Sequence, residues 1–129
     1  MKKYLLIILL LSCKSLYSQN LETLNDIQKK IYSNEDVQVK AEFSKGENYF
    51  KEYVLENLKK QPNKYINSEI SVCFIVDFEG TLLDVEIIKN TSNYSFDEIQ
   101  KVILNSPKWL SAEHDGYRVK VKVKFNFII

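Results

Sequence analysis

Glycine, proline, histidine and cysteine are all scarce in this chain of 129 residues, which has three glycines, two prolines, one histidine and two cysteines. So few glycines and prolines exclude a glycine-rich phosphate loop and a proline-rich spacer. A net charge of +1 lacks the basic excess that usually accompanies phosphate binding, so we expect no nucleic-acid partner. With 45% hydrophobic and 27% charged residues, the composition is that of one globular domain rather than a disordered chain or a multidomain enzyme.

The N-terminus has the pattern of a secretory signal peptide. Lys2 and Lys3 precede an apolar run over residues 4–11, and small residues follow near Ser18. A membrane-spanning helix needs about 20 apolar residues, which is far more than this run supplies. We therefore expect residues 1–18 to be a signal peptide and the mature protein to be periplasmic or associated with the outer membrane.

Two processing sites compete within this leader. Cleavage after Ser18 suits ordinary signal peptidase, whereas Leu10–Cys13 has the form of a bacterial lipobox with Cys13 as the lipidated residue. Only the second route would place the protein on a membrane. The first leaves 15 basic against 17 acidic residues, a net charge of −2, and retains Cys73 as the sole cysteine, which excludes an intramolecular disulfide.

The first half of the remaining chain shows weak strand and helix patterns. Residues 21–32 have apolar side chains at helical spacing, so this part of the extension over 19–41 is either a short amphipathic helix or a frayed leader. Alternation over 37–43 predicts a strand. Ser44 and Glu47 have capping-box spacing, which predicts a helix over 46–60 that ends before Pro62 and buries one apolar face.

A β-hairpin is predicted next. Residues 70–76 form an apolar strand, and Asp77–Gly80 supplies a turn in which Gly80 adopts a positive φ. On the return strand, alternation predicts two sets: core-facing Leu83, Val85 and Ile87, and solvent-facing Asp84 and Glu86.

A second helix and a long strand complete the domain. Ser95 and Glu98 form another capping box, ahead of a helix closed by Pro107 whose buried stripe is Phe96, Ile99, Val102 and Ile103. After a turn at Asp115–Gly116, Val and Phe alternate over 119–127 with Arg118, Lys120, Lys122, Lys124 and Asn126. The sequence therefore predicts an α+β fold: a small antiparallel sheet of about three to four strands with two helices packed on one face.

No catalytic or metal-binding constellation is evident. Cys73 lies within a strand and has no nearby base, so a small buried residue is the simpler interpretation. His114 stands between two acids in a turn, where neighbouring side chains converge poorly on a metal. Asp84 and Glu86 share a strand face, but no apolar pocket is evident that would raise the pKa of either. We therefore expect no enzyme activity, no metal and no cofactor.

Four short motifs occur in order along the domain expected over residues 42–129, the first of them beginning one residue earlier. They are AEFSKGE at 41–47, ISVCFIVDFEGTLLDVEII at 70–88, SPKW at 106–109, and DG at 115–116 before a basic strand. In order and spacing they resemble the C-terminal domain of TonB, particularly the form found in Bacteroidetes-type bacteria. The chain resembles only that terminal domain, because the transmembrane helix and proline-rich spacer of a complete TonB transducer have no counterpart here. Gln61–Pro62 also replaces the family's Tyr-Pro after the first helix.

The resemblance implies a non-enzymatic protein-interaction module. TonB-like domains accept an N-terminal segment of an outer-membrane transporter as an added strand, and the basic row on the last strand is the candidate partner-binding site: Arg118, Lys120, Lys122 and Lys124. Four like charges would favour an acidic peptide. The alternatives are a solvated sheet face whose lysines discourage edge pairing, and an envelope-associated structural protein, lipoprotein or homodimer that keeps the fold alone.

Overall fold

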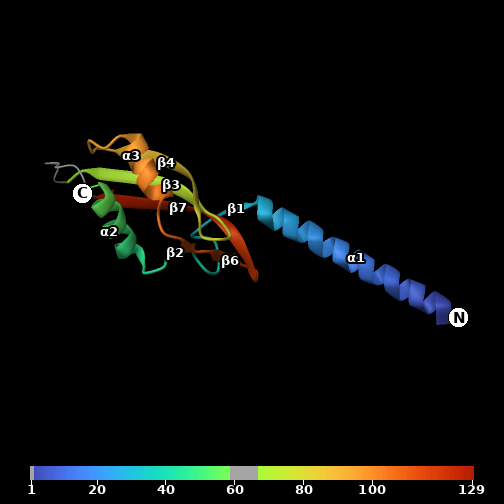
Figure 1. Ribbon diagram of the computed structural model, residues 1–129. Helices are drawn as coiled ribbons and strands as arrows, with labels where there is room; N and C mark the ends of the chain where they lie inside the picture. The colour runs from blue at the N-terminus through green and yellow to red at the C-terminus, as the bar shows by residue number, and fades with distance from the viewer. Residues whose placement is uncertain (1, 59–66) are drawn as a thin grey trace. The chain divides into compact units, whose positions relative to one another are not determined.

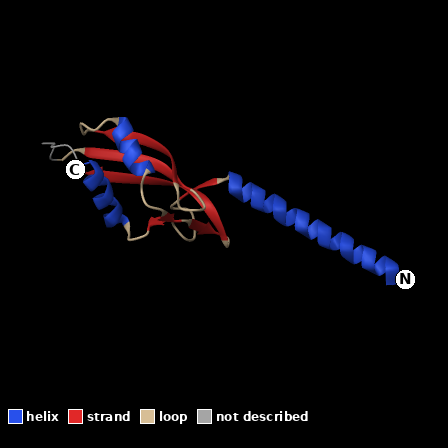
Figure 2. Cartoon of the chain, in the orientation of Figure 1, coloured by secondary structure: helices blue, strands red, loops and turns tan. Residues whose placement is uncertain are grey.

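The computed structural model describes residues 2–58 and 67–129 (Figures 1 and 2). The chain divides into two compact units, residues 1–30 and residues 31–129. The second unit thus includes residues 31–41, which the sequence assigned to an extension outside the domain.

The first unit is one helix, α1 (Lys2–Lys29), whose apolar side chains along residues 4–11 are exposed. By length and composition it could cross a membrane, a property that signal sequences near an N-terminus share. The helical pattern expected over 21–32 therefore holds as far as Lys29. Residues 31–33 instead form a strand.

The second unit is an α+β domain built on two sheets. The larger sheet has five strands in the order β1-β7-β3-β4, with β6 also paired to β7, and the smaller pairs β2 with β5. The strands are β1 (Ile31–Ser33), β2 (Glu42–Phe43), β3 (Glu69–Val76), β4 (Leu82–Asn90), β5 (Trp109–Leu110), β6 (Ala112–His114) and β7 (Tyr117–Ile128).

The larger sheet is mixed rather than purely antiparallel. β3 pairs antiparallel with both β4 and β7, as expected of a hairpin joined by the long last strand. β1 adds parallel to β7 at Lys120–Lys122, which sequence patterning did not predict. Three residues are too few to show periodicity, and their pairing depends on a strand distant in sequence.

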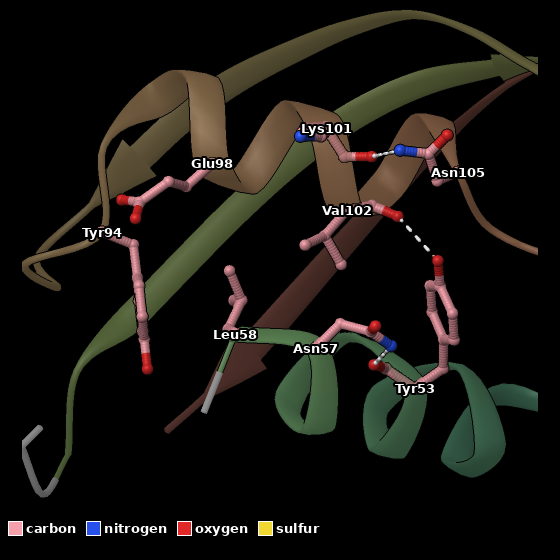
Figure 3. Close-up of a pocket in the computed structure, with 8 residues that line it drawn as sticks. All are labelled: Tyr53, Asn57, Leu58, Tyr94, Glu98, Lys101, Val102 and Asn105. Carbon is pink, nitrogen blue, oxygen red and sulfur yellow. Dashed lines mark hydrogen bonds between the residues drawn. The ribbon is translucent and has the colours of Figure 1, made fainter. Parts of the chain in front are cut away.

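Two helices, α2 (Glu47–Leu58) and α3 (Phe96–Leu104), pack against the sheet and against each other. The hydroxyl of Tyr53 on α2 donates a 3.0 Å hydrogen bond to the Val102 carbonyl on α3. Both helices lie on the same side of the strands (Figure 3). The end of the first predicted helix, residues 59–60 and Pro62, lies outside the described residues.

The core between helices and sheet is aromatic. The Phe50 ring of α2 is fully buried and meets the Phe74 ring of β3 at 5.9 Å, the Phe125 ring of β7 at 5.0 Å and the Trp109 indole at 4.9 Å. Each contact is edge-to-face, the geometry that the quadrupoles of aromatic rings favour. On β7 the predicted alternation is confirmed, since the five residues Val119, Val121, Val123, Phe125 and Phe127 are all buried.

The return strand β4 differs from the predicted alternation because it carries bulges. Asp84 adopts φ 49°, and the pairing with β3 shifts register between Cys73 and Ile75. The shift exposes Leu83, predicted to face the core, and buries Leu82 in its place. A second register shift follows between Ser71 and Val72.

The two predicted capping boxes have different outcomes. Ser95 caps α3 as expected, with its hydroxyl accepting from the Glu98 amide and the Glu98 carboxylate accepting from the Ser95 amide. Ser44 does not cap α2, because Gly46 adopts φ 93° and the helix begins only at Glu47. Phe96 is also not buried as predicted; it opens α3 with 63% of its surface exposed.

The alternation over 37–43 does not produce one continuous strand. Val39 makes an isolated bridge to Glu113, and only Glu42–Phe43 is a strand. The reason lies in the side chain of Asn34. Its NH2 group donates to the Ala41 carbonyl, and its carbonyl oxygen accepts from the Ala41 N–H. This side chain closes the loop in the way that a strand partner would.

Candidate functional site

The larger sheet presents two edges, and they differ in what covers them. The strand order places β4 at one edge and β7, partly covered by β1, at the other. A free sheet edge offers a row of main-chain donors and acceptors to another extended segment. Each edge is therefore a candidate site for strand addition.

The outer edge of β7 is open beyond β1. The Lys122 carbonyl accepts a 3.1 Å hydrogen bond from the Asn34 amide, so Lys122 faces outward. Because main-chain groups alternate sides along a strand, Lys124, Asn126 and Ile128 also present their N–H and C=O groups to this edge. Within the described ranges, no strand pairs with these three residues on that side.

A groove of about 450 Å³ runs along this open edge. One wall is β7 from Val123 to Asn126, and the other comes from the first turns of α2, from Phe43 and from the loop after β1. Along an added strand, alternate side chains would point toward the helices or away from them. Those on the helix side would enter this groove, where the Phe43 and Phe125 rings are themselves buried and polar side chains make up much of the lining.

Two of the three lysines that line the groove, Lys40 and Lys51, form ion pairs with glutamates of the same chain. Lys51 lies 2.9 Å from the Glu47 carboxylate and 5.7 Å from the centre of the Phe125 ring. Lys40 forms an ion pair with Glu35. Three lysines and three glutamates line the groove, so it offers main-chain hydrogen bonds more than it offers net positive charge.

The opposite edge, β4, is irregular. Its two register shifts against β3 interrupt the row of main-chain groups, and bulges of this kind discourage edge-to-edge pairing. The Gln100 side chain on α3 also donates a 3.3 Å hydrogen bond to the Val85 carbonyl. Of the two edges, the outer edge of β7 is the better template for an added strand.

The four basic residues on β7 lie beside this edge but have separate surroundings. Lys122 forms an ion pair with Glu86 at 3.4 Å, and the Lys120 ammonium lies 5.3 Å from the centre of the Phe78 ring. Arg118 is opposite Glu113 in the β6–β7 pairing. Lys124 is the member of the row that lines the groove.

A second cavity, of about 360 Å³, lies between α2 and α3 (Figure 3). Burial raises the pKa of Tyr53, whose hydroxyl is bonded to Val102 across the cavity. Asn57 and Asn105 donate to carbonyls of their own helices. These polar groups serve the helix packing, and they form no nucleophile–base pair.

The residues considered for catalysis are separated by the fold. Cys73 is buried in β3 opposite Lys124, whereas His114 lies at the end of β6 with its ring 5.1 Å from that of Tyr32. Asp84 and Glu86, in contrast, are both exposed on β4 and line one hollow together with Lys122, so neither carboxylate lies in an apolar pocket. Among the described residues, no group of three or more His, Cys, Asp or Glu side chains could hold a metal ion.

Sequence reasoning did not identify the residues that shape the groove. Asn34 anchors the loop that forms one wall, while Phe43 and Lys51 contribute aromatic and aliphatic surface. A buried asparagine has no periodic signature, and the placement of Lys51 over Phe125 depends on how α2 crosses β7. Only the basic strand itself gave a signal in the sequence.

Comparisons with protein-family models, with curated proteins and with solved structures found no match to this chain.

Proposed function

We propose that the domain over residues 31–129 is an exported, TonB C-terminal-like interaction module. It binds an extended protein segment by strand addition, and the partner we favour is the N-terminal part of an outer-membrane transporter. The observation that carries the proposal is the outer edge of β7 from Lys124 to Ile128, with which no strand of residues 2–58 or 67–129 pairs, and the groove beside it. The sequence motifs that resemble TonB supply the identity of the partner.

Main-chain pairing is the source of affinity in this proposal. Each outward-facing residue of the edge offers one donor and one acceptor, and each net hydrogen bond contributes about 1 kcal/mol. Specificity comes from the side chains of the added strand that enter the groove between β7 and the first turns of α2. Because Lys40 and Lys51 of the groove are paired with Glu35 and Glu47, an acidic peptide gains little from these two lysines over a neutral one.

Export fits the N-terminal features. Two lysines and an apolar run precede the domain, and α1 carries that run on its exposed surface. Cleavage after Ser18 gives a periplasmic protein, and lipidation of Cys13 gives an outer-membrane lipoprotein with the same domain. Intact-mass measurement of the membrane and soluble fractions separates these two products.

Peptide titration tests the function. Peptides from the N-termini of transporters of the same organism are titrated against the protein, with scrambled peptides as controls, and affinity is measured by calorimetry. We expect binding at micromolar concentration for at least one native peptide and none for its scrambled form. Equal binding of both, or no binding at high micromolar concentration, would contradict the proposal.

A homodimer is the second use of the same edge. Two copies of β7 could pair through their open edges, which would satisfy the same main-chain groups. Sedimentation across a range of protein concentrations distinguishes the two states. A stable dimer that peptides fail to dissociate would favour the envelope-associated structural role over peptide binding.

A further inference from the structure

β1 occupies part of the edge that the proposed partner would use. It pairs with Lys120–Lys122 on the same side of β7 on which Lys124–Ile128 stay open, because β3 fills the other side. A segment longer than the open stretch would therefore meet β1.

The attachment of β1 is short and exposed. The strand is three residues long, Ile31 keeps 48% of its surface exposed, and Ser33 is exposed as well. A hollow of about 670 Å³ borders the strand, between β1 and the Ile75 and Lys122 side chains of the sheet. The Ile31 side chain beside this hollow gains less dispersion energy than it would in a filled core. The ring of Tyr32 lies 5.1 Å from that of His114.

The chain immediately after β1 is held much more firmly. Asn34 is buried, and its side chain makes two hydrogen bonds with the Ala41 backbone, at 3.1 Å and 2.8 Å. Breaking this pair would leave buried polar groups without partners, at a cost of about 1–3 kcal/mol each. The strand can thus leave β7 while the loop from Asn34 to Ala41 stays in place, so Asn34 marks the hinge.

We propose, on the basis of the function proposed above, that β1 is a displaceable strand that competes with the partner segment for the outer edge of β7. With β1 in place, the open edge runs from Lys124 to Ile128. With β1 released, it runs from Lys120 to Ile128. Competition by β1 favours long partner segments, because only those form enough additional main-chain hydrogen bonds with β7 to replace the bonds lost when β1 leaves.

A ligand-free measurement tests whether β1 opens locally. Amide hydrogen exchange is followed by NMR on the full chain, in a mild detergent that covers its apolar N-terminal run. The Asn34 amide, bonded to Lys122, is expected to exchange at least about tenfold faster than the Ala41 amide, bonded to the Asn34 side chain. Equal protection of the two amides would overturn the proposal.

Peptides of two lengths test the competition. Alternating Thr–Val peptides of five and nine residues serve as probes, because they are uncharged and extended. Tyr32→Ala, which removes the ring contact with His114, is expected to tighten binding of the nine-residue peptide severalfold and to leave the five-residue peptide unchanged. The matched control is Tyr49→Ala, an exposed tyrosine on α2, which should change neither.

The two proposals fail in different ways. If neither peptide binds the wild-type protein, strand addition fails, and the exchange rates alone then decide whether β1 is displaceable. If both peptides bind but Tyr32→Ala leaves the nine-residue affinity unchanged or weaker, strand addition stands and competition by β1 is wrong.

Discussion

The two edges of the larger sheet differ in how regular a row of main-chain groups they present. On β4, two register shifts and the Gln100 side chain interrupt the row of main-chain groups. On β7, eight consecutive residues pair with β3 without a shift, so the opposite side of the same strand is equally regular. The two edges therefore differ in the regularity of their backbones. They do not differ in the presence of charged side chains, because both carry them.

Gly80, in the turn that leads into β4, gives the largest expected effect. It adopts φ 81°, and a Cβ atom there would lie 1.8 Å from the Trp109 carbonyl oxygen. We expect Gly80→Ala to lower the free energy of unfolding by about 4 kcal/mol or more. The added Cβ would collide with a backbone carbonyl, which cannot move aside as a flexible side chain could. Urea denaturation measures this.

Gly116→Ala is the matched control for that substitution. Its φ of 80° is nearly the same, but nothing lies within 4 Å of the added atom. Only the cost of the left-handed conformation remains, about 1–2 kcal/mol. Equal losses for the two variants would show that the approach of Gly80 to Trp109 does not constrain the β3–β4 turn.

A proline at the open edge should abolish the proposed binding. Asn126→Pro removes an outward N–H from β7 while leaving the bonds to β3 intact, because those come from the alternate residues. We expect peptide affinity to fall by at least about tenfold, with the free energy of unfolding changed much less. Ile88→Lys on the β4 edge, where the side chain is already exposed, should leave the affinity unchanged. If Ile88→Lys lowered the peptide affinity as much as Asn126→Pro does, the assignment of peptide binding to the β7 edge rather than the β4 edge would be wrong.

The Asn34 side chain should contribute measurably to stability beside the open edge. Asn34→Ala leaves the Ala41 N–H and C=O without their partners in a buried site, so we expect a loss of about 1–3 kcal/mol in the free energy of unfolding. Asn105→Ala, which removes an exposed bond within α3, should cost less than about 0.5 kcal/mol. Equal losses of stability in the two variants would show that the bonds between the Asn34 side chain and Ala41 do not hold the groove wall.

Charge should matter little to the proposed binding. We expect the peptide affinity to change by less than about threefold when salt is raised tenfold, because two of the three groove lysines, Lys40 and Lys51, already pair with glutamates. The double variant Lys120→Glu/Lys122→Glu should also have a small effect, since neither residue lines the groove beside the open edge. A steep salt dependence would instead support the acidic peptide suggested by the basic row in the sequence.

The smallest expected effect concerns pH at the far end of the hairpin. The Lys89 ammonium bonds to Glu69 and holds the pKa of that carboxyl below its ordinary value. Such a group stabilises the fold above its ordinary pKa, and this contribution is lost as pH falls through the lowered value. In an NMR titration, Lys89→Gln should raise the pKa of Glu69 toward normal. No change would mean that the pair is not formed in solution.

How much of this could be predicted from the sequence depends on whether local patterns decide the feature. The last strand was predictable because five alternating Val and Phe residues can bury only one face. Gly80 and the Ser95 cap were predictable because turns and helix starts have strong local chemistry. Likewise, the turn at Asp115–Gly116 was predictable, as both residues adopt positive φ.

The candidate site was less predictable because it depends on which strands become neighbours. The row at Arg118–Lys124 lies on the strand that carries the candidate edge, but its charges gave no indication of the open main-chain edge beside it. β1 gave no strand signal, since its three residues pair in parallel with a strand distant in the sequence. The β4 bulges arise from pairing against β3, and they reversed the expected burial of Leu83.

Peptide-induced protection of main-chain amides tests the central claim most directly. Hydrogen exchange is measured by NMR with and without a bound transporter peptide. The outward amides of Lys124, Asn126 and Ile128 should exchange rapidly without peptide and become protected with it, while β4 amides do not change. Protection along β4 or around the cavity between α2 and α3, with the β7 edge unchanged, would contradict the account.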